Sequence, residues 1–360
     1  MTQTKIAVFT GSDLRNYGGG EKDVIRWVTT LKDELDITIF TPEDKDTSHH
    51  RITKEQLPDL KIVWYRGKKI RLLRDIIPLQ RFDLSAFDKV YSMCQGFILN
   101  RAIMRQSKRF LLGIHAQSTL AKQPIEAHKL WKRIFFRLLY PINMHYIKKA
   151  DEIRIQNSDD ERRLHEIGFR GKIWNVPPSM FDDTPEPTET DKFYVIWFNR
   201  ISPEKRPEKL VEIAKKLPNI EFHTAGSGPM VHLLDGVSNI RKLGFLPDRE
   251  LSDELRKASL CILTSRGENF GMSAVEAQAH GVPTLSYNVM GLRDYNETVE
   301  DTDQMVRRIS DYYESWKKDR AAYLDERKKL RGATLKRFSD SIVIPQIKKM
   351  MTGGDVREWE

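Results

Sequence analysis

The apolar positions in the first half of the chain fall into short runs that alternate with longer stretches of helical length. Short apolar runs bounded by polar or glycine-rich turns are typical of buried strands. Strands are predicted at residues 5–10, 36–41, 60–65, 88–93, 109–114 and 151–158, and helices at 21–35, 97–104 and over a long stretch that ends near Ala150. This alternation predicts a parallel sheet with helices on both faces.

The same alternation begins again in the second half. Strands are predicted at 193–199, 219–226, 239–244, 260–265 and 283–287, and helices at 207–217, from Met230, around 251–258 and at 272–280. Residues 177–192 are the most proline-rich and acidic stretch of the chain, which predicts a linker. The chain is therefore assigned to the α/β class, with domains at 1–176 and 193–335 and a helical tail over 336–360. Ligands of doubly wound sheets bind beyond the carboxyl ends of the strands, so a cleft between two facing sheets is the expected site.

Charge adds one feature to this picture. The formal net charge is +9, and two stretches, 65–82 and 128–149, interleave Lys and Arg with bulky apolar residues. In the second stretch, apolar residues recur at helical spacing with cations between them: Leu130, Ile134 and Leu138, with Lys129, Lys132, Arg133 and Arg137. The stretch fits a core helix with a cationic outer face or a helix on an anionic membrane surface. Nucleic-acid binding is not expected, because no recognition motif accompanies the charge.

Cysteine usage and the N-terminus bear on the compartment. Only Cys94 and Cys261 are present, both in apolar surroundings, which is typical of a reduced, cytosolic protein. The first apolar run lacks a cleavage-site pattern, and no run reaches the roughly 20 residues of a bilayer span. A cytoplasmic protein is expected, with peripheral association at the inner membrane face if the basic apolar stretches bind lipid.

The stretch SRGENFGMSAVEAQAHGVP, residues 265–283, carries the strongest candidate chemistry. It places Glu268 in a strand-to-helix loop and Glu276 inside the helix that follows. At about 1.5 Å of rise per residue, Glu276 is expected roughly 7 to 8 Å beyond the helix start. A helix N-terminus attracts anions. The two carboxylates therefore favour a ligand with a phosphate in the middle and hydroxyls at both ends.

Three further motifs lie where predicted strands end. Arg200 and Lys205 flank a proline turn and are suited to clamping a diphosphate, although they also fit two surface cations. A run of three glycines ending at Gly20 lets the backbone approach a ligand, or simply forms a flexible turn. His115 ends a strand of the first half, where a packed histidine is the alternative. Asp44 and Asp46 have the spacing of a cation site but lie away from these motifs, so no metal site is assigned.

The order of GGGEK, GIHAQ, ADEIRIQNS, NRISPEK, AGSGP, LGFLP and SRGENFGMSAVEAQAHGVP resembles glycosyltransferase family 4. The resemblance implies the GT-B fold, with two facing doubly wound Rossmann-like domains and a central cleft. It also implies a retaining transferase that uses a nucleotide-diphosphate sugar. In such folds the C-terminal helix can cross back onto the first domain.

The resemblance also implies roles for individual residues. Glu276 would bind the donor ribose, Glu268 a hydroxyl of the transferred sugar, and Arg200 with Lys205 the leaving diphosphate. The catalytic set would be His115, Glu268, Arg200 and Lys205. The remaining donor contacts would be Gly19 and Gly20 near the phosphates or acceptor, Leu246 near the base, and amides of Asn269, Phe270, Gly271 and Met272.

The implied chemistry needs neither a cofactor nor a metal. The donor would be a UDP- or GDP-sugar, the acceptor lipid-linked or a glycan, and transfer a front-face attack assisted by the leaving phosphate. A non-catalytic partner subunit of a transferase and a sugar-nucleotide epimerase stay open as alternatives. The chain departs from the family pattern at NVPPSMFD, which replaces an asparagine–glycine turn, and at Met290, which replaces one glycine of a pair.

Overall fold

The structure is a computed structural model that describes residues 3–47, 51–70, 75–79, 81–94, 96–116, 119–120 and 130–353. Side chains are not described at 69–70, 75–77 and 130–133. The chain divides into two compact units. Unit 1 is Met1–Ser179 with Ser341–Glu360, and unit 2 is Met180–Asp340.

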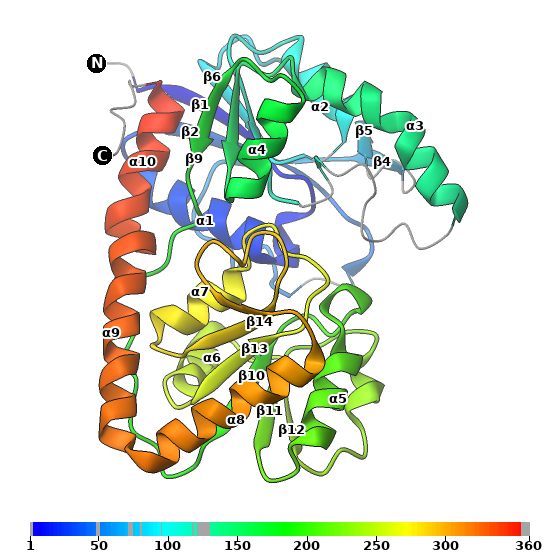
Figure 1. Ribbon diagram of the computed structural model, residues 1–360. Helices are drawn as coiled ribbons and strands as arrows, with labels where there is room; N and C mark the ends of the chain where they lie inside the picture. Colours follow the sequence, from blue (N-terminus) through cyan, green and yellow to red (C-terminus); the bar gives the residue numbers. More distant parts are fainter. Residues whose placement is uncertain are drawn as a thin grey trace. The chain divides into compact units, whose positions relative to one another are not determined.

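The sheet of unit 1 has seven strands, all paired in parallel (Figure 1). Its order is β3 (Ile62–Tyr65), β2 (Asp36–Pro42), β1 (Lys5–Phe9), β6 (Lys89–Ser92), β7 (Phe110–Gly113), β8 (Glu152–Ile155) and β9 (Lys172–Asn175). A separate antiparallel pair, β4 (Gly67–Ile70) and β5 (Asp75–Pro78), falls within the basic stretch 65–82 and was not predicted from the sequence.

Helices cover both faces of this sheet, as the predicted α/β alternation requires. They are η1 (Leu14–Asn16), α1 (Gly19–Leu31), α2 (Phe97–Met104), α3 (Leu130–Ile147), α4 (Ser158–Glu166) and α10 (Asp340–Thr352). Because side chains alternate along a strand, Ile6 and Val8 of β1 pack with α1 and α10, whereas Ala7 and Phe9 pack with α2, α3 and α4. Helix α4 was not predicted, although Asn157 caps its first turn by accepting the N–H of Asp160.

The helix that follows unit 2 in sequence belongs to unit 1. Val343, Ile347 and Met350 of α10 are fully buried in the cluster that contains Trp27. The Nζ of Lys89 also donates to the carbonyl of Met350 at 2.5 Å. Helix α10 therefore completes one face of the unit 1 sheet.

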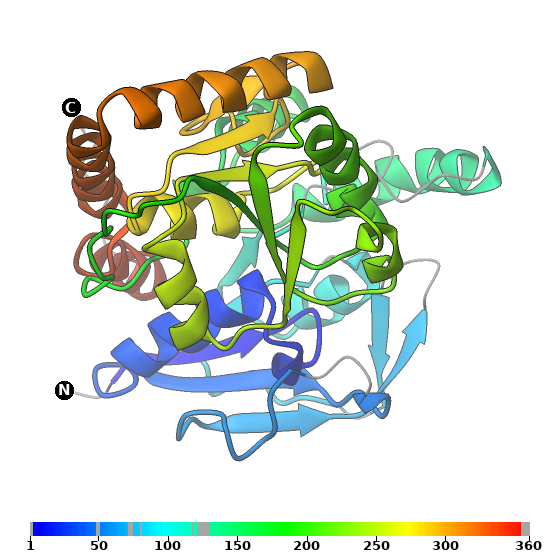
Figure 2. The same cartoon turned by 90° about the horizontal axis from the view of Figure 1, so that it is seen from below.

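The sheet of unit 2 has six parallel strands (Figure 2). Its order is β12 (Ile240–Gly244), β11 (Glu221–Ala225), β10 (Tyr194–Phe198), β13 (Leu260–Leu263), β14 (Thr284–Tyr287) and β15 (Glu297–Val299). The helices are η3 (Pro203–Lys205), α5 (Pro207–Lys216), η4 (Val231–Leu234), α6 (Asp248–Leu255), α7 (Met272–Ala279), α8 (Thr302–Lys318) and α9 (Arg320–Phe338). The strand order reverses between β10 and β13, and ligands of such sheets bind at that switch point.

Two sequence expectations for unit 2 are corrected by the structure. Residues 177–192 do not form a free linker, because unit 2 already begins at Met180. Guanidinium groups of α9 hold this stretch: Arg327 donates to the carbonyl of Thr188 at 3.1 Å and Arg331 to that of Thr184 at 3.1 Å. The helix predicted from Met230 is only the short η4, which ends just before Gly236, a residue with φ of 73°.

Candidate functional site

The loops that follow β10, β11 and β13 converge at the carboxyl edge of the unit 2 sheet. The turn after β11 lies against the loop after β10, because Ile201 donates its N–H to the carbonyl of Ser227 at 2.9 Å. A Cβ on Gly226 would lie 2.0 Å from the carbonyl oxygen of Asn199, so only glycine permits this contact. The loop after β13 joins them through Arg266, whose N–H donates to the carbonyl of Glu204 at 2.9 Å. The three loops form one surface.

An ion pair between Lys205 and Glu268 lies at the centre of this surface. The Lys205 side chain is 20% exposed and the Glu268 side chain 12%. Both Lys205 and the hydroxyl of Ser265, at 2.6 Å, contact Oε1 of Glu268. The other carboxylate oxygen, Oε2, has no partner among the residues that the structure describes. The fixed carboxylate can therefore accept a hydrogen bond from a ligand.

Thr264 fixes the two loops to each other and to the core. Its hydroxyl donates to the carbonyl of Lys205 at 2.6 Å and accepts from the indole N–H of Trp197 at 3.0 Å. Thr264 and Trp197 are both fully buried. A buried polar group must find a partner, so these bonds hold Lys205 in place across the switch point.

Helix α7 begins at this surface, and its N-cap residue provides no side-chain cap for the first amide groups. Its N-cap is Gly271, with φ of 85°. A Cβ there would lie 2.3 Å from Cδ2 of Leu292 and 2.9 Å from the hydroxyl of Tyr295. Glycine therefore satisfies both the positive φ and the close packing, and free amides at a helix start favour an anion.

Tyr295 packs against the loop that carries Glu268 and bonds to its backbone. Its hydroxyl donates to the carbonyl of Phe270, and the carbonyl of Gly271 lies 3.1 Å away. Burial raises the pKa of Tyr295 well above its usual value, and the nearby charge of Glu268 acts in the same direction. Tyr295 was not identified from the sequence. Just before it in the chain, Gly291 packs on the backbone of residues 268–269.

The remaining predicted residues of unit 2 lie at the same edge of the sheet. Arg200 is exposed and forms no ion pair with any described residue. Glu276 is half-buried in α7, and its carbonyl accepts from Nδ1 of His280 at 2.8 Å. Leu246 is half-buried beyond β12, whose Gly244 accepts the N–H of Gly226 at 2.6 Å. Asn269 and Phe270 are buried, and Met272 opens α7.

The predicted residue His115 lies in unit 1, just beyond β7. The hydroxyl of Tyr91 contacts its Nε2, and the side-chain amide of Gln156 lies 3.2 Å from its Nδ1. Behind Tyr91, the buried Arg154 pairs with Asp23 at 2.9 Å. Burial, with the positive charge of Arg154, holds the pKa of His115 well below its usual 6.5. Both ring nitrogens are thus engaged within unit 1, as in the packed-histidine alternative of the sequence analysis.

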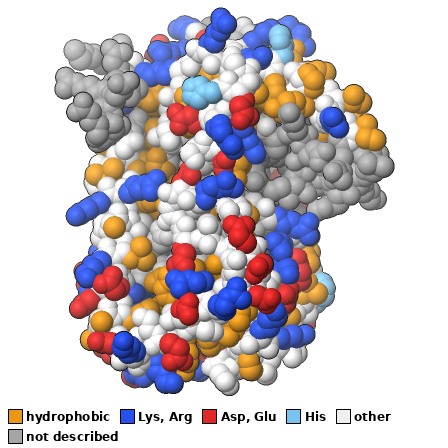
Figure 3. All heavy atoms as spheres, viewed as in Figure 1, with side chains coloured by type: hydrophobic (Ala, Val, Ile, Leu, Met, Phe, Trp, Pro, Cys, Tyr) orange, Lys and Arg blue, Asp and Glu red, His pale blue; other side chains and the backbone are white. Residues whose placement is uncertain are grey.

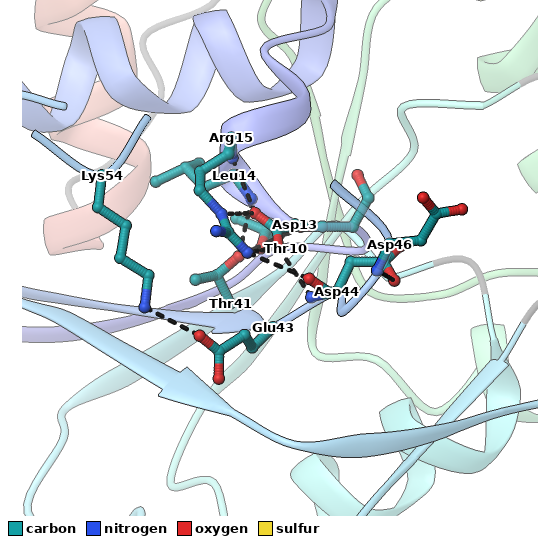
Figure 4. A network of polar contacts seen from close by, with 10 residues as sticks. Thr10, Asp13, Leu14, Arg15, Thr41, Glu43, Asp44, Asp46 and Lys54 are labelled. Atoms are coloured by element: carbon teal, nitrogen blue, oxygen red, sulfur yellow. Dashed lines mark hydrogen bonds and ion pairs between the residues drawn. The ribbon is translucent and has the colours of Figure 1, made fainter. Parts of the chain in front are cut away.

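Gly19 and Gly20 form the start of α1, after a loop that polar contacts fix (Figure 4). Asp13 accepts from Nε of Arg15 at 3.0 Å and from the N–H of Asp44 at 2.8 Å. Asp44 in turn accepts the N–H of Asp46 at 3.3 Å. Among the described residues, no group of three or more His, Cys, Asp or Glu is placed to hold a metal ion.

Comparison with known proteins finds a family model that matches part of the chain. Residues 181–331 match the family model of glycosyl transferases group 1. A D-inositol 3-phosphate glycosyltransferase of Mycobacterium tuberculosis (strain ATCC 25618 / H37Rv) is 32% identical over 174 residues, 41% of this chain and 36% of that protein. The chain therefore spans little more than a third of the curated relatives that it matches.

Solved structures resemble nearly the whole chain. Sucrose-phosphate synthase (tll1590) from Thermosynechococcus elongatus has a TM-score of 0.74 at 15% identity, covering 98% of this chain and 99% of that one. Anabaena Alr3699/HepE, solved in complex with UDP-glucose, has a TM-score of 0.72 at 15% identity, covering 98% and 100%. At this identity the likeness shows the fold, and the predicted GT-B fold is confirmed.

Replacing Gly271 tests the turn that opens α7. We expect Gly271→Ala to lower the free energy of unfolding by about 2 kcal/mol or more, because the methyl group meets Leu292 at a positive φ. Gly332→Ala in α9 is the control, since a Cβ there meets nothing within 4 Å. It should be neutral or stabilise by up to about 1 kcal/mol. If urea denaturation gave the same change in the free energy of unfolding for both variants, the packing described at Gly271 would be contradicted.

The low pKa of His115 predicts an acid-sensitive unit 1. Below about pH 6.5 the unfolded chain takes up a proton at this imidazole and the folded chain does not, so the free energy of unfolding falls as the pH falls. Between pH 7.5 and 5.5, the free energy of unfolding measured by denaturation should decline less in His115→Gln than in the wild type. His165→Gln, which removes an exposed imidazole of α4, is the control. An equally steep decline in His115→Gln would refute the assignment.

Proposed function

We propose that this chain, whose residues 181–331 belong to the group 1 glycosyl transferases, is a retaining hexosyltransferase that takes its sugar from a nucleotide-diphosphate donor. The observation that carries the proposal is the Lys205–Glu268 pair beside the uncapped start of α7. A cation, a fixed carboxylate and free helix amides are what a diphosphate joined to a sugar requires. A UDP-sugar is the favoured donor, because Anabaena HepE was solved with UDP-glucose.

Most of the proposed donor contacts come from residues of unit 2. Oε2 of Glu268 would accept from a hydroxyl of the transferred sugar, because Lys205 and Ser265 engage only Oε1. Lys205 and the exposed Arg200 would contact the diphosphate together with the amides of residues 269–272. Glu276, farther along α7, would bind the ribose, and Leu246 would lie near the base. His115, Gly19 and Gly20 remain proposed contacts on unit 1.

The proposed reaction exchanges one bond for another at the anomeric carbon. The bond to the donor phosphate oxygen breaks while a bond to the acceptor oxygen forms on the same face. The acceptor proton passes to the departing phosphate oxygen, so atoms and charges balance without a protein acid–base pair. Negative charge grows on the leaving diphosphate, where Arg200, Lys205 and the α7 amides would stabilise it. Two cationic side chains and the neutral amide donors together support transfer without a metal ion.

The acceptor side of the proposal rests on α3, which extends outward from unit 1 (Figures 1 and 2). Ile134, Leu138 and Ile142 follow one another at four-residue spacing and are 53%, 70% and 44% exposed. The exposed Arg137 lies beside them, whereas the end of the helix is buried at Met144 and Ile147. Figure 3 shows hydrophobic side chains gathered on this part of unit 1.

An exposed apolar row with flanking cations fits the boundary of an anionic membrane. The acceptor would then be lipid-linked or a growing glycan, and the protein would work at the cytoplasmic face. No helix among the described residues is long and apolar enough to cross a bilayer. The side chains of Lys132 and Arg133, which the sequence also assigned to this surface, lie outside the described residues.

Thermal unfolding with nucleotides tests the donor site. UDP at 100 times its dissociation constant should stabilise the protein by about 2.7 kcal/mol. We expect the shift to persist in EDTA and to disappear in Glu276→Ala but not in Glu314→Ala, which removes an exposed carboxylate of α8. A melting shift with GDP alone would mean that the donor carries guanine and not uracil. No shift with UDP, GDP, ADP or CDP would favour the non-catalytic partner subunit.

Flotation with liposomes tests the membrane surface. Ile134→Ser with Leu138→Ser should weaken binding to anionic vesicles at least tenfold, because each buried apolar side chain contributes about 1.5–3 kcal/mol. Changing Lys132, Arg133 and Arg137 to Glu should also release the protein. Ile342→Ser, at a 40%-exposed position of α10, is the control. Unchanged flotation of the first variant would refute membrane association and leave the donor site untouched.

A further inference from the structure

A pocket of about 570 Å³ lies at the amino-terminal edge of the unit 2 sheet. Its lining comes from the residues just before β10, β11 and β12, from the first residues of β11 and β12, and from one side of α8. Its volume is within the range of small-ligand sites, about 300–1,000 Å³. Neither the sequence motifs nor the proposed transfer reaction accounts for it.

This pocket is separate from the proposed donor site. All strands of the sheet run parallel, so the loops that carry Lys205 and Glu268 lie at the opposite edge. Strand β10 has five residues. At about 3.3 Å per residue, the two edges lie on the order of 16 Å apart. A ligand in the pocket would not touch Lys205 or Glu268.

One wall of the pocket is aromatic. Phe193 packs edge-on against Tyr313 and Trp316, with ring centroids 5.4 and 5.7 Å away. Tyr313 and Trp316 stack on each other along α8, and Tyr313 is only half-buried. The guanidinium of Arg320 lies 4.5 Å over the Trp316 ring. The wall is therefore held rigidly and offers an apolar edge to a ligand.

The residues of the lining at the starts of β11 and β12 supply polar groups. Asn219, Ser238 and Arg241 are exposed, and none forms a side-chain hydrogen bond or ion pair with a described residue. Beside them, the Asn239 amide lies 2.9 Å from each of three backbone carbonyls, those of Ala214, Leu217 and Ile220. These bonds fix the rim before any ligand binds.

The formal charges of the side chains that line the pocket sum to zero. They are two carboxylates, Asp191 and Glu221, and two cations, Lys192 and Arg241. Lys192 pairs with Glu221, whose other partner is His223 at 2.7 Å, and Asp191 pairs with Arg320 at 3.2 Å. With two carboxylates and two cations, the lining has no net formal charge, which favours a neutral ligand over a charged one.

We propose that this pocket binds a neutral saccharide. A sugar ring presents an apolar C–H face to an aromatic wall, and its hydroxyls both donate and accept hydrogen bonds. The lining offers donors at Asn219, Ser238 and Arg241 and acceptors at Asp191 and Glu221. The site holds a segment of the glycan acceptor or product away from the transfer site, a role that rests on the proposed glycosyltransferase function.

Saturation-transfer NMR with maltotriose, cellotriose and mannotriose tests this assignment in the full chain. At least one trisaccharide should bind the wild type, and Asn219→Ala with Arg241→Ala should weaken it about tenfold or more, because two hydrogen-bonding groups are lost. Arg249→Ala, an exposed cation of α6, is the control. Both changed residues are exposed, so the melting temperature should not move.

The proposed donor site and the proposed saccharide pocket can be refuted independently of each other. Glu276→Ala should lose the UDP-induced melting shift and keep trisaccharide binding, and the Asn219/Arg241 variant should show the reverse. Binding of none of the three trisaccharides would overturn the saccharide assignment, as would binding that survives in the Asn219/Arg241 variant. Displacement of the bound trisaccharide by a sulfated heparin tetrasaccharide would overturn its neutral character.

Discussion

The arrangement of the carboxyl edge of unit 2 depends on the ion pair between Lys205 and Glu268. Each charge comes from a different side of the switch point, one after β10 and one after β13. Both side chains are largely removed from water, and a charge in that position needs its partner. The bonds of Thr264 and Ser265 set the geometry of the pair. The pair links the β10 and β13 loops beside the start of α7 and leaves Oε2 of Glu268 open to a ligand.

Unit 1 also contains a buried ion pair that holds several segments together. The fully buried Arg154 pairs with Asp23 of α1 and donates to the carbonyls of Val176 and Pro177 at 2.9 Å each. Through Tyr91 it also sets the surroundings of His115. Breaking a buried pair by removing one partner costs about 3–5 kcal/mol. The last residues before unit 2 are therefore fixed to the sheet that carries His115.

Much of this could be predicted from local sequence patterns. Apolar runs located the sheets, and the order of motifs located Glu268, Glu276 and the start of α7, because strand–loop–helix signals act over a few residues. The Lys205–Glu268 pair could not be predicted, since its members are 63 residues apart and the exposed-turn signal of one says nothing about the other. Residues 177–192 look like a linker by composition, and only the arginines of α9 reveal their packing. The pocket at the amino-terminal edge of the unit 2 sheet gives no motif, because its lining comes from strand starts and α8, which are scattered along the chain.

A crystal structure of the protein with UDP-glucose tests the central claim most directly. The account predicts the diphosphate at the start of α7 in contact with Lys205 and Arg200, the ribose hydroxyls on Glu276, and a sugar hydroxyl on Oε2 of Glu268. The nucleotide bound away from the β10 and β13 loops, or bound there with Glu268 still out of reach of the sugar, would contradict it.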